Sequence, residues 1–311
     1  MQSPVLIMGP MHEPTLATLE ANYACHRLWT AADKPALFKQ LADSCQVVVT
    51  NGSRGISAAE MAQLRKLQLV DCFGVGVDAI DLNYARSHRI AVTNTPDVLT
   101  EDVADLAVSL LLATIRRIPF GDQFVRQGKW LRDGMALTRT MQQCRIGIVG
   151  LGRIGQAIAK RCAAFNTTIA YYGPRRKADV PYQHFDDVVK LADWAQVLIA
   201  ACPGGAATNK IVSRAALKAL GNDGLFVNIA RGSVVDQDAL VEMLVAGELG
   251  GAGLDVFNDE PNVPGALMSL DNVVLHPHQG SATHATRAEM GRLVLENLAA
   301  YVAGKALVTP V

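Results

Sequence analysis

The residue pattern with the clearest chemical meaning lies in the middle of the chain. Gly150, Gly152 and Gly155 are spaced as G-x-G-x-x-G, directly after a short apolar run and at the start of a segment with helical period. The first glycine permits a tight turn, the second lets the backbone approach a pyrophosphate, and the third lets the helix pack on the strand. The amides of Arg153 and Ile154 would face the phosphate at the positive end of that helix. The pattern therefore predicts a dinucleotide site, and the alternative is a glycine-rich turn without a ligand.

The residues after the next apolar run indicate which dinucleotide is bound. An Asp or Glu about twenty residues beyond the glycines would bind the ribose hydroxyls of NAD. No acid is present there: Gly173 holds that place, and Arg175, Arg176 and Lys177 follow after a proline. A 2′-phosphate needs positive, forked donors, so we expect NADP(H) to be preferred, with Arg175 and Arg176 binding the phosphate and NAD(H) as a second cofactor. The alternative is a basic loop that only faces solvent.

The apolar pattern indicates the scaffold that positions these residues. Short, almost wholly apolar runs alternate with longer segments of helical period, which is typical of a parallel sheet covered by helices on both faces. The runs in the first third of the chain are residues 5–9, 47–50, 67–70 and 90–93. The runs of the second group are residues 146–149, 169–172, 197–200, 225–228, 253–256 and 273–275. The second group has six strands, which is the count of a complete dinucleotide-binding sheet.

Two helices mark where the second group of strands begins and ends. The acids and apolar residues after Thr100 predict a helix that continues to about Ile118, ahead of Pro119. Residues 121–140 follow as a loose segment, and the last helix is predicted from residue 283 to residue 303. Because no linker or low-complexity tract occurs, we expect the domain boundaries to fall at the starts of these two helices.

The composition of the 311 residues excludes several classes of protein. Half of the residues are apolar, which is enough to bury a core and excludes a disordered chain. Lys and Arg number 29, as do Asp and Glu, so we expect no nucleic-acid or membrane partner from overall charge. The longest apolar run, residues 106–113, is too short to span a membrane, and Met1-Gln2-Ser3-Pro4 does not resemble a signal peptide. Six cysteines without a Cys-x-x-Cys pair predict free thiols in the cytoplasm.

Five further segments carry a resemblance to a known family. Residues 227–236 read VNIARGSVVD, residues 253–261 read GLDVFNDEP, and residues 276–283 read HPHQGSAT. In this order, after the glycine motif, they resemble the D-isomer-specific 2-hydroxyacid dehydrogenases. The likeness extends to FGVGVD at residues 73–78 and TPDVLTEDVAD at residues 95–105, so it covers nearly the whole chain. The basic loop and the absence of extra domains look most like the NADPH-linked glyoxylate/hydroxypyruvate reductases.

The resemblance implies an α/β fold of two doubly wound parallel-sheet domains. A Rossmann-type NAD(P)-binding domain, residues 100–284, would be inserted into a flavodoxin-like substrate-binding domain that combines residues 1–99 and 285–311. Dimers of this family form through the cofactor domain, so the resemblance also implies a homodimer, with Trp130 of the loose segment at the interface.

The resemblance also implies a reaction, the reduction of a small 2-oxo acid to a D-2-hydroxy acid with hydride from NADPH. His278 would be the general acid, because histidine has an ordinary pKa near neutral pH. Glu260 would pair with it and favour the imidazolium, and Arg231 would hold the substrate carboxylate and polarise the carbonyl. Without the family context, each has a plainer alternative: a capping histidine, a turn-initiating glutamate and a surface arginine.

Further residues would hold the substrate. The resemblance implies that the backbone amides of Val75 and Gly76 hold the other carboxylate oxygen, while the loop with Asn51 and Gly52 closes the far side of the pocket. Gln279 stands where an aliphatic residue is common in the family, so it either shifts specificity or hydrogen-bonds locally. His-x-His at residues 276–278 lacks accompanying carboxylate or cysteine ligands at a metal-site spacing, and no metal is predicted.

The remaining implied residues would line the cofactor. Asp255, together with the backbone around Ile229 and Ala230, would bind the nicotinamide carboxamide, with capping of a loop as the alternative for Asp255. Cys202 and Pro203 would lie against the cofactor, with Cys202 as a packing residue because no activating partner is evident.

Two rival functions remain open at this point. The same fold serves as a cofactor-sensing transcriptional corepressor, which retains the Arg, Glu and His but carries extended flanking segments. Another D-2-hydroxyacid dehydrogenase, such as one acting on 3-phosphoglycerate, is the rival within the enzyme class, although its larger forms carry regulatory domains.

Overall fold

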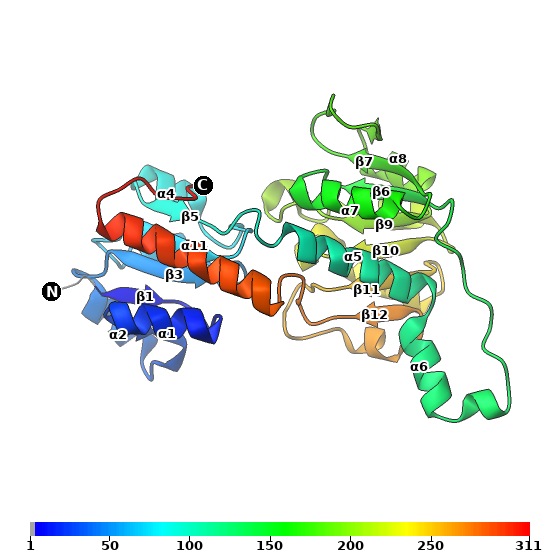
Figure 1. Cartoon of the computed structure of the whole chain (residues 1–311), viewed down its shortest axis with the longest axis horizontal. Coiled ribbons are helices and arrows are strands. Elements are labelled where there is room, and N and C mark those ends of the chain that lie inside the picture. The colour runs from blue at the N-terminus through cyan, green and yellow to red at the C-terminus, as the bar shows by residue number, and fades with distance from the viewer. Residues whose placement is uncertain (1–3) are drawn as a thin grey trace. The chain divides into compact units, whose positions relative to one another are not determined.

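The chain divides into two compact units. The structure is a computed structural model that describes residues 4–311, and Met1–Ser3, on which the expectation about a signal peptide partly rests, lie outside the described residues. Among the described residues, the first unit consists of residues 4–99 and Ser281–Val311, and the second of Thr100–Gly280 (Figure 1). Each unit has its own parallel sheet and its own cluster of buried apolar side chains. The assignment of substrate binding to one and cofactor binding to the other stays a prediction.

The sheet of the first unit has five parallel strands in the order β2-β1-β3-β4-β5. The strands are β1 (Val5–Ile7), β2 (Cys25–Arg27), β3 (Val47–Asn51), β4 (Leu69–Phe73) and β5 (Ala91–Thr93). This is the flavodoxin-like order, in which the chain reverses its direction of winding between β1 and β3. The sequence pattern missed β2, because an edge strand with half-buried residues Cys25, His26 and Arg27 does not form an apolar run.

Helices cover the sheet of the first unit. They are α1 (Glu13–Asn22), α2 (Lys34–Leu41), α3 (Ala58–Met61), α4 (Leu82–Ser87), α11 (His284–Val302) and the 3₁₀ turn η1 (Leu28–Thr30). The side chain of Thr283 caps α11 by accepting a hydrogen bond from the Thr286 amide, and α11 packs on α1 and β4. The predicted last helix, residues 283–303, is therefore confirmed within one residue at each end.

The sheet of the second unit has seven parallel strands in the order β12-β11-β10-β9-β6-β7-β8. The strands are β6 (Arg145–Val149), β7 (Thr168–Tyr172), β8 (Gln183–Phe185), β9 (Val197–Ala200), β10 (Leu225–Asn228), β11 (Gly251–Leu254) and β12 (Val273–Leu275). From β6 onward this is the Rossmann order with one further strand. The predicted count of six was wrong, because β8 is a short edge strand of mixed polarity. The predicted start of β11, residue 253, lies two residues after the observed start at Gly251. Gly251 pairs with Leu225, but a glycine does not register as part of an apolar run.

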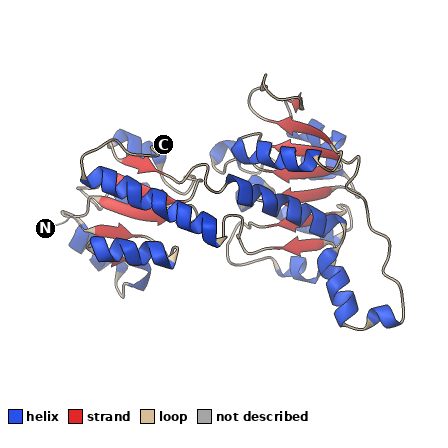
Figure 2. Ribbon diagram, viewed as in Figure 1, coloured by secondary structure: helices blue, strands red, loops and turns tan. Residues whose placement is uncertain are grey.

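The helices of the second unit lie on both faces of its sheet (Figure 2). Helices α5 (Thr100–Ile115) and α7 (Arg153–Ala163) pack together on one face, whereas α8 (Val188–Trp194), α9 (Arg214–Leu220) and α10 (Gln237–Val245) cover the other. The remaining elements are α6 (Ile118–Arg126) and the 3₁₀ turns η2 (Lys129–Leu131), η3 (Ala206–Thr208), η4 (Gly232–Val234) and η5 (Gly265–Ser269). The predicted α/β class with two doubly wound parallel sheets is confirmed.

The predicted helix from Thr100 to Ile118 is shorter than expected. It ends at Ile115, and Arg117 takes the left-handed backbone conformation (φ 50°) before α6 begins. Proline suits the first turn of a helix, so Pro119 starts α6 and part of the predicted loose segment is helical. Within residues 4–311, no helix has the length and apolar content needed to cross a bilayer.

Candidate active site

The glycine loop of the second unit has the geometry that a bound pyrophosphate requires. Gly150 has a positive φ of 95°, and a Cβ there would lie 2.7 Å from the backbone of Cys202. A Cβ on Gly155 would lie 2.1 Å from the Gly150 carbonyl oxygen, so only glycine lets α7 approach β6 this closely. Around Gly152, in contrast, no atom lies within 4 Å of the Cβ position, so the space above the loop is open. Residues Arg153 and Ile154 begin α7, and the contact of their amides with a phosphate stays a prediction. This chain's residues thus fit a dinucleotide.

The end of β7 presents positive charge and no carboxylate. A side chain at Gly173 would meet nothing closer than 3.8 Å, so the fold itself leaves room for an acid that the sequence does not place there. Arg175 and Arg176 are exposed, and neither forms an ion pair with another described residue. The Gly173 carbonyl oxygen lies 2.9 Å from Nε2 of His184, which fixes the start of this loop. Two arginines therefore remain available to an anion at the position predicted for the 2′-phosphate.

A buried asparagine shapes the turn that carries Arg231. Asn228, at the end of β10, is fully buried; its Nδ2 donates to the Arg231 carbonyl oxygen (2.9 Å) and its Oδ1 accepts from the Ala230 amide (3.1 Å). Ile229 and Ala230 are buried between these contacts. Sequence reasoning overlooked Asn228, and a polar residue at the end of an otherwise apolar strand was the signal that could have found it.

The structure places His278 and Glu260 in direct contact. His278 Nδ1 lies 2.7 Å from Glu260 Oε2, and Glu260 Oε1 accepts from the Phe257 amide at 3.0 Å. Burial raises the pKa of Glu260, but the hydrogen bonds from His278 and Phe257 and the charge of Arg231 outweigh it, so the pKa lies below its ordinary value. An ionised carboxylate can only accept, so the proton of a neutral His278 ring lies on Nδ1, and Nε2 has no partner among the described residues.

Asp255 holds the loop that carries His278 in place through hydrogen bonds. The carboxylate is 1% exposed, and it accepts from the amides of Gln279 (2.8 Å) and Gly280 (3.0 Å) and pairs with Nδ1 of His276 (2.9 Å). The Asp255 carbonyl accepts from the His278 amide, which holds His278 in the left-handed region at φ 53°. Asp255 thus already has three donors from this loop. Its contact with a nicotinamide carboxamide stays a prediction, and the structure adds a positioning role that sequence reasoning missed.

The other predicted residues of the second unit have simple surroundings. Cys202 is 8% exposed, and burial raises the pKa of its thiol to about 11, in keeping with a packing role beside the glycine loop. Pro203 follows it at the end of β9. Gln279 Nε2 donates to the Pro277 carbonyl oxygen at 3.2 Å, which is the local hydrogen bond named above as one of its two roles. Among the described residues, no three His, Cys, Asp or Glu side chains gather as a metal site would require.

In the first unit, the loop after β4 presents two backbone amides. The Val75 carbonyl accepts from Asn94 Nδ2 (2.8 Å), and the Gly76 carbonyl accepts from the Cys72 thiol (3.6 Å). The amides of Val75 and Gly76 have no hydrogen-bond partner in the part of the chain that the structure describes. Two adjacent free amides suit an anionic oxygen, and their contact with the substrate carboxylate stays a prediction. Asn94, which holds this loop, is a second residue that sequence reasoning missed.

The loop after β3 carries the other predicted substrate residues. Gly52 lies close to the β4 loop, since a Cβ on Gly74 would meet the Gly52 nitrogen at 3.3 Å. Asn51 uses its side chain within its own unit, accepting from the amides of Ser53 and Arg54. Its role in binding a substrate stays a prediction.

Comparison with known proteins identifies the family. Residues 108–280 match the family described as D-isomer specific 2-hydroxyacid dehydrogenase, NAD binding domain. A glyoxylate/hydroxypyruvate reductase A of Arabidopsis thaliana is 47% identical over 307 residues, 99% of this chain and 98% of that protein. A hydroxyphenylpyruvate reductase of Plectranthus scutellarioides is 44% identical over 99% of this chain and 98% of its own. The crystal structure of an NADPH-dependent glyoxylate/hydroxypyruvate reductase of Sinorhizobium meliloti, in complex with NADP and malonate, has a TM-score of 0.94 at 39% identity, covering 100% of this chain and 97% of that one. The predicted resemblance is confirmed, and the chain belongs to the D-isomer specific 2-hydroxyacid dehydrogenase family.

Proposed function

We propose that this protein reduces a small 2-oxo acid, glyoxylate or hydroxypyruvate or a similar acid, to the D-2-hydroxy acid with NADPH. The observation that carries the proposal is the hydrogen bond of 2.7 Å between His278 and Glu260. The charge of Arg231 also acts on Glu260, and all three residues belong to the unit that holds the glycine loop. Relatives that bear the names of glyoxylate/hydroxypyruvate reductases support the same reaction.

The proposed roles follow from the chemistry of each side chain. NADPH, when bound, supplies the hydride that adds to the carbonyl carbon of the acid. Arg231 forks onto the carboxylate and the carbonyl oxygen and draws electron density from that carbon. His278 gives its Nε2 proton to the oxygen as negative charge develops there, and Glu260 stabilises the imidazolium beforehand. In the reverse direction His278 takes the proton back.

The two units divide these tasks in the proposal. The second unit, predicted as residues 100–284, binds the dinucleotide at Gly150, Gly152 and Gly155. The first unit, predicted as residues 1–99 and 285–311, holds the substrate carboxylate on the free amides of Val75 and Gly76.

We further propose that NADP(H) is preferred to NAD(H). The support is the combination at the end of β7: space at Gly173 without an acid, and exposed Arg175 and Arg176 without ion-pair partners among the described residues. A carboxylate at this place would repel a 2′-phosphate, whereas guanidinium groups bind it bidentately.

We also propose that the protein is a cytoplasmic homodimer. All six cysteines are free thiols in the structure, which suits a reducing compartment. Trp130 is 70% exposed, Leu131 91% and Leu137 100%, on the segment that follows α6. Large apolar side chains gathered on one exposed segment are typical of an interface between copies. Replacing Trp130 and Leu131 by serine should convert a dimer to a monomer in analytical ultracentrifugation, and a wild-type monomer would contradict the proposal.

One set of initial-rate measurements tests the reaction and the cofactor. Purified protein is mixed with glyoxylate or hydroxypyruvate, and NADPH and NADH oxidation are followed in parallel. We expect turnover with a lower KM for NADPH, and a loss of about 10²–10⁴ in kcat for His278→Ala. Arg175→Ala with Arg176→Ala should raise the KM for NADPH far more than for NADH. NADPH binding without turnover of any small 2-oxo acid would instead favour a cofactor sensor.

A further inference from the structure

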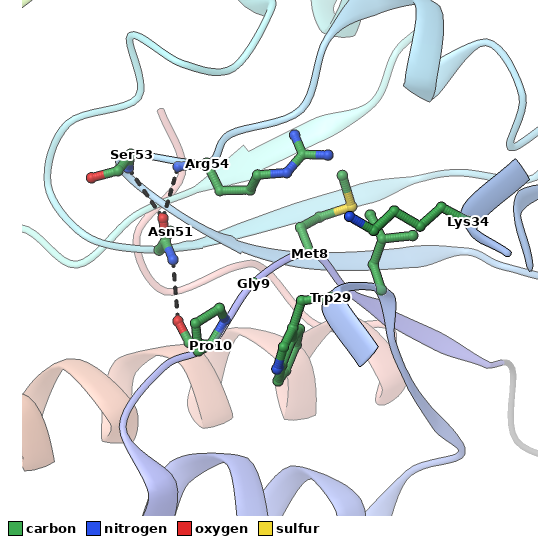
Figure 3. Close-up of a pocket in the computed structure, with 9 residues that line it drawn as sticks. Met8, Gly9, Pro10, Trp29, Lys34, Asn51, Ser53 and Arg54 are labelled. Atoms are coloured by element: carbon green, nitrogen blue, oxygen red, sulfur yellow. Dashed lines mark hydrogen bonds between the residues drawn. The ribbon is translucent and has the colours of Figure 1, made fainter. Parts of the chain in front are cut away.

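A cavity of about 390 Å³ opens in the first unit, at the carboxyl ends of β1, β2 and β3 (Figure 3). Its walls come from the last residue of β3, from residues that follow these three strands, and from the first residue of α2. Strands β1 and β3 are the neighbours between which the winding of the sheet reverses, and open α/β sheets bind ligands outside the carboxyl ends at such a point. We call this cavity the β1–β3 pocket.

Asn51 gives the pocket a fixed frame. Its Oδ1 accepts from the amides of Ser53 (3.1 Å) and Arg54 (2.8 Å), and its Nδ2 donates to the Pro10 carbonyl oxygen (3.2 Å). The loop after β3 is thereby tied to the loop after β1, as Figure 3 shows. Both lone pairs of Oδ1 and one of two N–H groups are used, so Asn51 can offer a ligand one donor at most. Binding therefore depends on the other walls.

Two cationic side chains dominate those walls. Arg54 is held by Glu60 through Nη2–Oε1 (2.5 Å) and Nη1–Oε2 (3.4 Å), which leaves three of its five N–H donors for other partners. The side chain of Lys34 forms no hydrogen bond or ion pair with any residue of the described range 4–311. In Figure 3 the two side chains reach toward each other over Met8. None of the side chains that line the pocket is acidic. The pocket thus offers many donors and a net positive charge.

Apart from Ser53, the remaining lining side chains are apolar, and the volume is large. Met8 is buried, and Leu28 and Trp29 from η1 also line the pocket. A cavity of about 390 Å³ lies within the range of roughly 300–1,000 Å³ that holds organic ligands of many atoms. A two- or three-carbon acid would leave most of this space to water. The pocket fits a longer carbon chain that packs on Trp29 and carries oxygen atoms for the donors.

We propose that the β1–β3 pocket binds the far end of 2-oxo acids longer than three carbons, and that Lys34 and Arg54 select tails that carry oxygen, as hydroxyls or as a second acid group. This inference rests on the proposed function and names the substrate class of that activity. An apolar tail would displace water from the two cations without offering them hydrogen-bond acceptors. Polar sites reject apolar analogues for this reason, because a desolvated charge without a partner costs binding free energy.

Three six-carbon 2-oxo acids of equal chain length test the proposal. 2-Oxohexanoate has an apolar tail, 2-oxoadipate ends in a carboxylate, and 2-oxogluconate carries hydroxyls. We expect kcat/KM with NADPH to be about tenfold higher for at least one oxygen-bearing acid than for 2-oxohexanoate, which is the effect of one exposed charge-assisted hydrogen bond. Lys34→Met should abolish that preference by lowering kcat/KM for the oxygen-bearing acid and raising it for 2-oxohexanoate, because a methionine holds no water that an apolar tail must displace. Lys39→Met is the matched control, because Lys39 is exposed on the same helix and does not line the pocket.

The outcomes separate this inference from the proposed function. A higher kcat/KM for 2-oxoadipate alone indicates an anion site, and a higher kcat/KM for 2-oxogluconate alone indicates a hydroxyl site. Either result supports the proposal. Equal kcat/KM values for the three acids, or an unchanged preference in Lys34→Met, would overturn it while glyoxylate is still reduced. If no 2-oxo acid is reduced, binding of 2-oxoadipate to the pocket is measured by the quenching of tryptophan fluorescence. Quenching in the wild type that is lost in Trp29→Phe supports binding in this pocket. Absence of quenching in the wild type refutes the inference.

Discussion

Replacing Glu260 by Gln removes the charge behind His278 and leaves the shape of the side chain almost unchanged. In the structure the two carboxylate oxygens accept from two different donors, His278 Nδ1 at 2.7 Å and the Phe257 amide at 3.0 Å. A glutamine has one carbonyl oxygen, so its NH₂ group must face one of these donors. Either the backbone turn or the orientation of His278 loses its acceptor, and the imidazolium loses its counter-charge.

The magnitude follows from the exposure of the pair. A hydrogen bond to a charged group contributes about 1.5–3 kcal/mol. The side chains of His278 and Glu260 are 35% and 27% exposed, so water screens the pair and the lower part of that range applies, about 1.5–2 kcal/mol. At about 1.36 kcal/mol for each factor of ten, kcat/KM should fall by roughly 10- to 30-fold.

The assay is NADPH oxidation with glyoxylate as the varied substrate, together with the melting temperature of each variant. Glu248→Gln, an exposed carboxylate of the same unit, serves as the control and should match the wild type in both measurements. If Glu260→Gln keeps kcat/KM within twofold of the wild type at an unchanged melting temperature, Glu260 has no part in proton transfer and the reasoning is refuted.

Two further predictions concern stability and the cofactor loop. Asp71 is fully buried on β4 with one oxygen bonded to the Thr93 hydroxyl (2.7 Å), and burial raises its pKa to about 7 despite that bond. The folded state therefore holds this proton more tightly than the unfolded chain, and the free energy of unfolding should fall as the pH rises from about 4 to 7. Asp71→Asn should remove that dependence, as measured by urea unfolding at pH 5 and pH 8. The same change in unfolding free energy between the two pH values in both proteins would contradict the assignment. Gly155→Ala should lower the melting temperature, because its Cβ would lie 2.1 Å from the Gly150 carbonyl oxygen. Gly152→Ala should fold normally, because its Cβ enters open space above the loop, but it should raise the KM for NADPH. Equal stability losses in the two alanine variants would show that the loop is only structural.

The sequence alone predicted the parts of this protein that depend on local composition. Central parallel strands are buried on both faces, so β1, β3 and β9 are nearly continuous apolar runs that can be recognised without a structure. The roles of Gly150 and Gly155 were equally predictable, because a tight turn and a close helix–strand approach exclude every side chain.

The tertiary structure decided the features that depend on distant neighbours. The edge strands β2 and β8 went unrecognised because each has a neighbour on one side only and contains polar residues. The role of Asp255 could not be predicted from spacing, because its three partners lie more than twenty residues away and meet it only where β11 and β12 run side by side. Apolar periodicity records which residues are buried, whereas hydrogen bonds between loops depend on which strands are neighbours, and only the folded sheet determines that order.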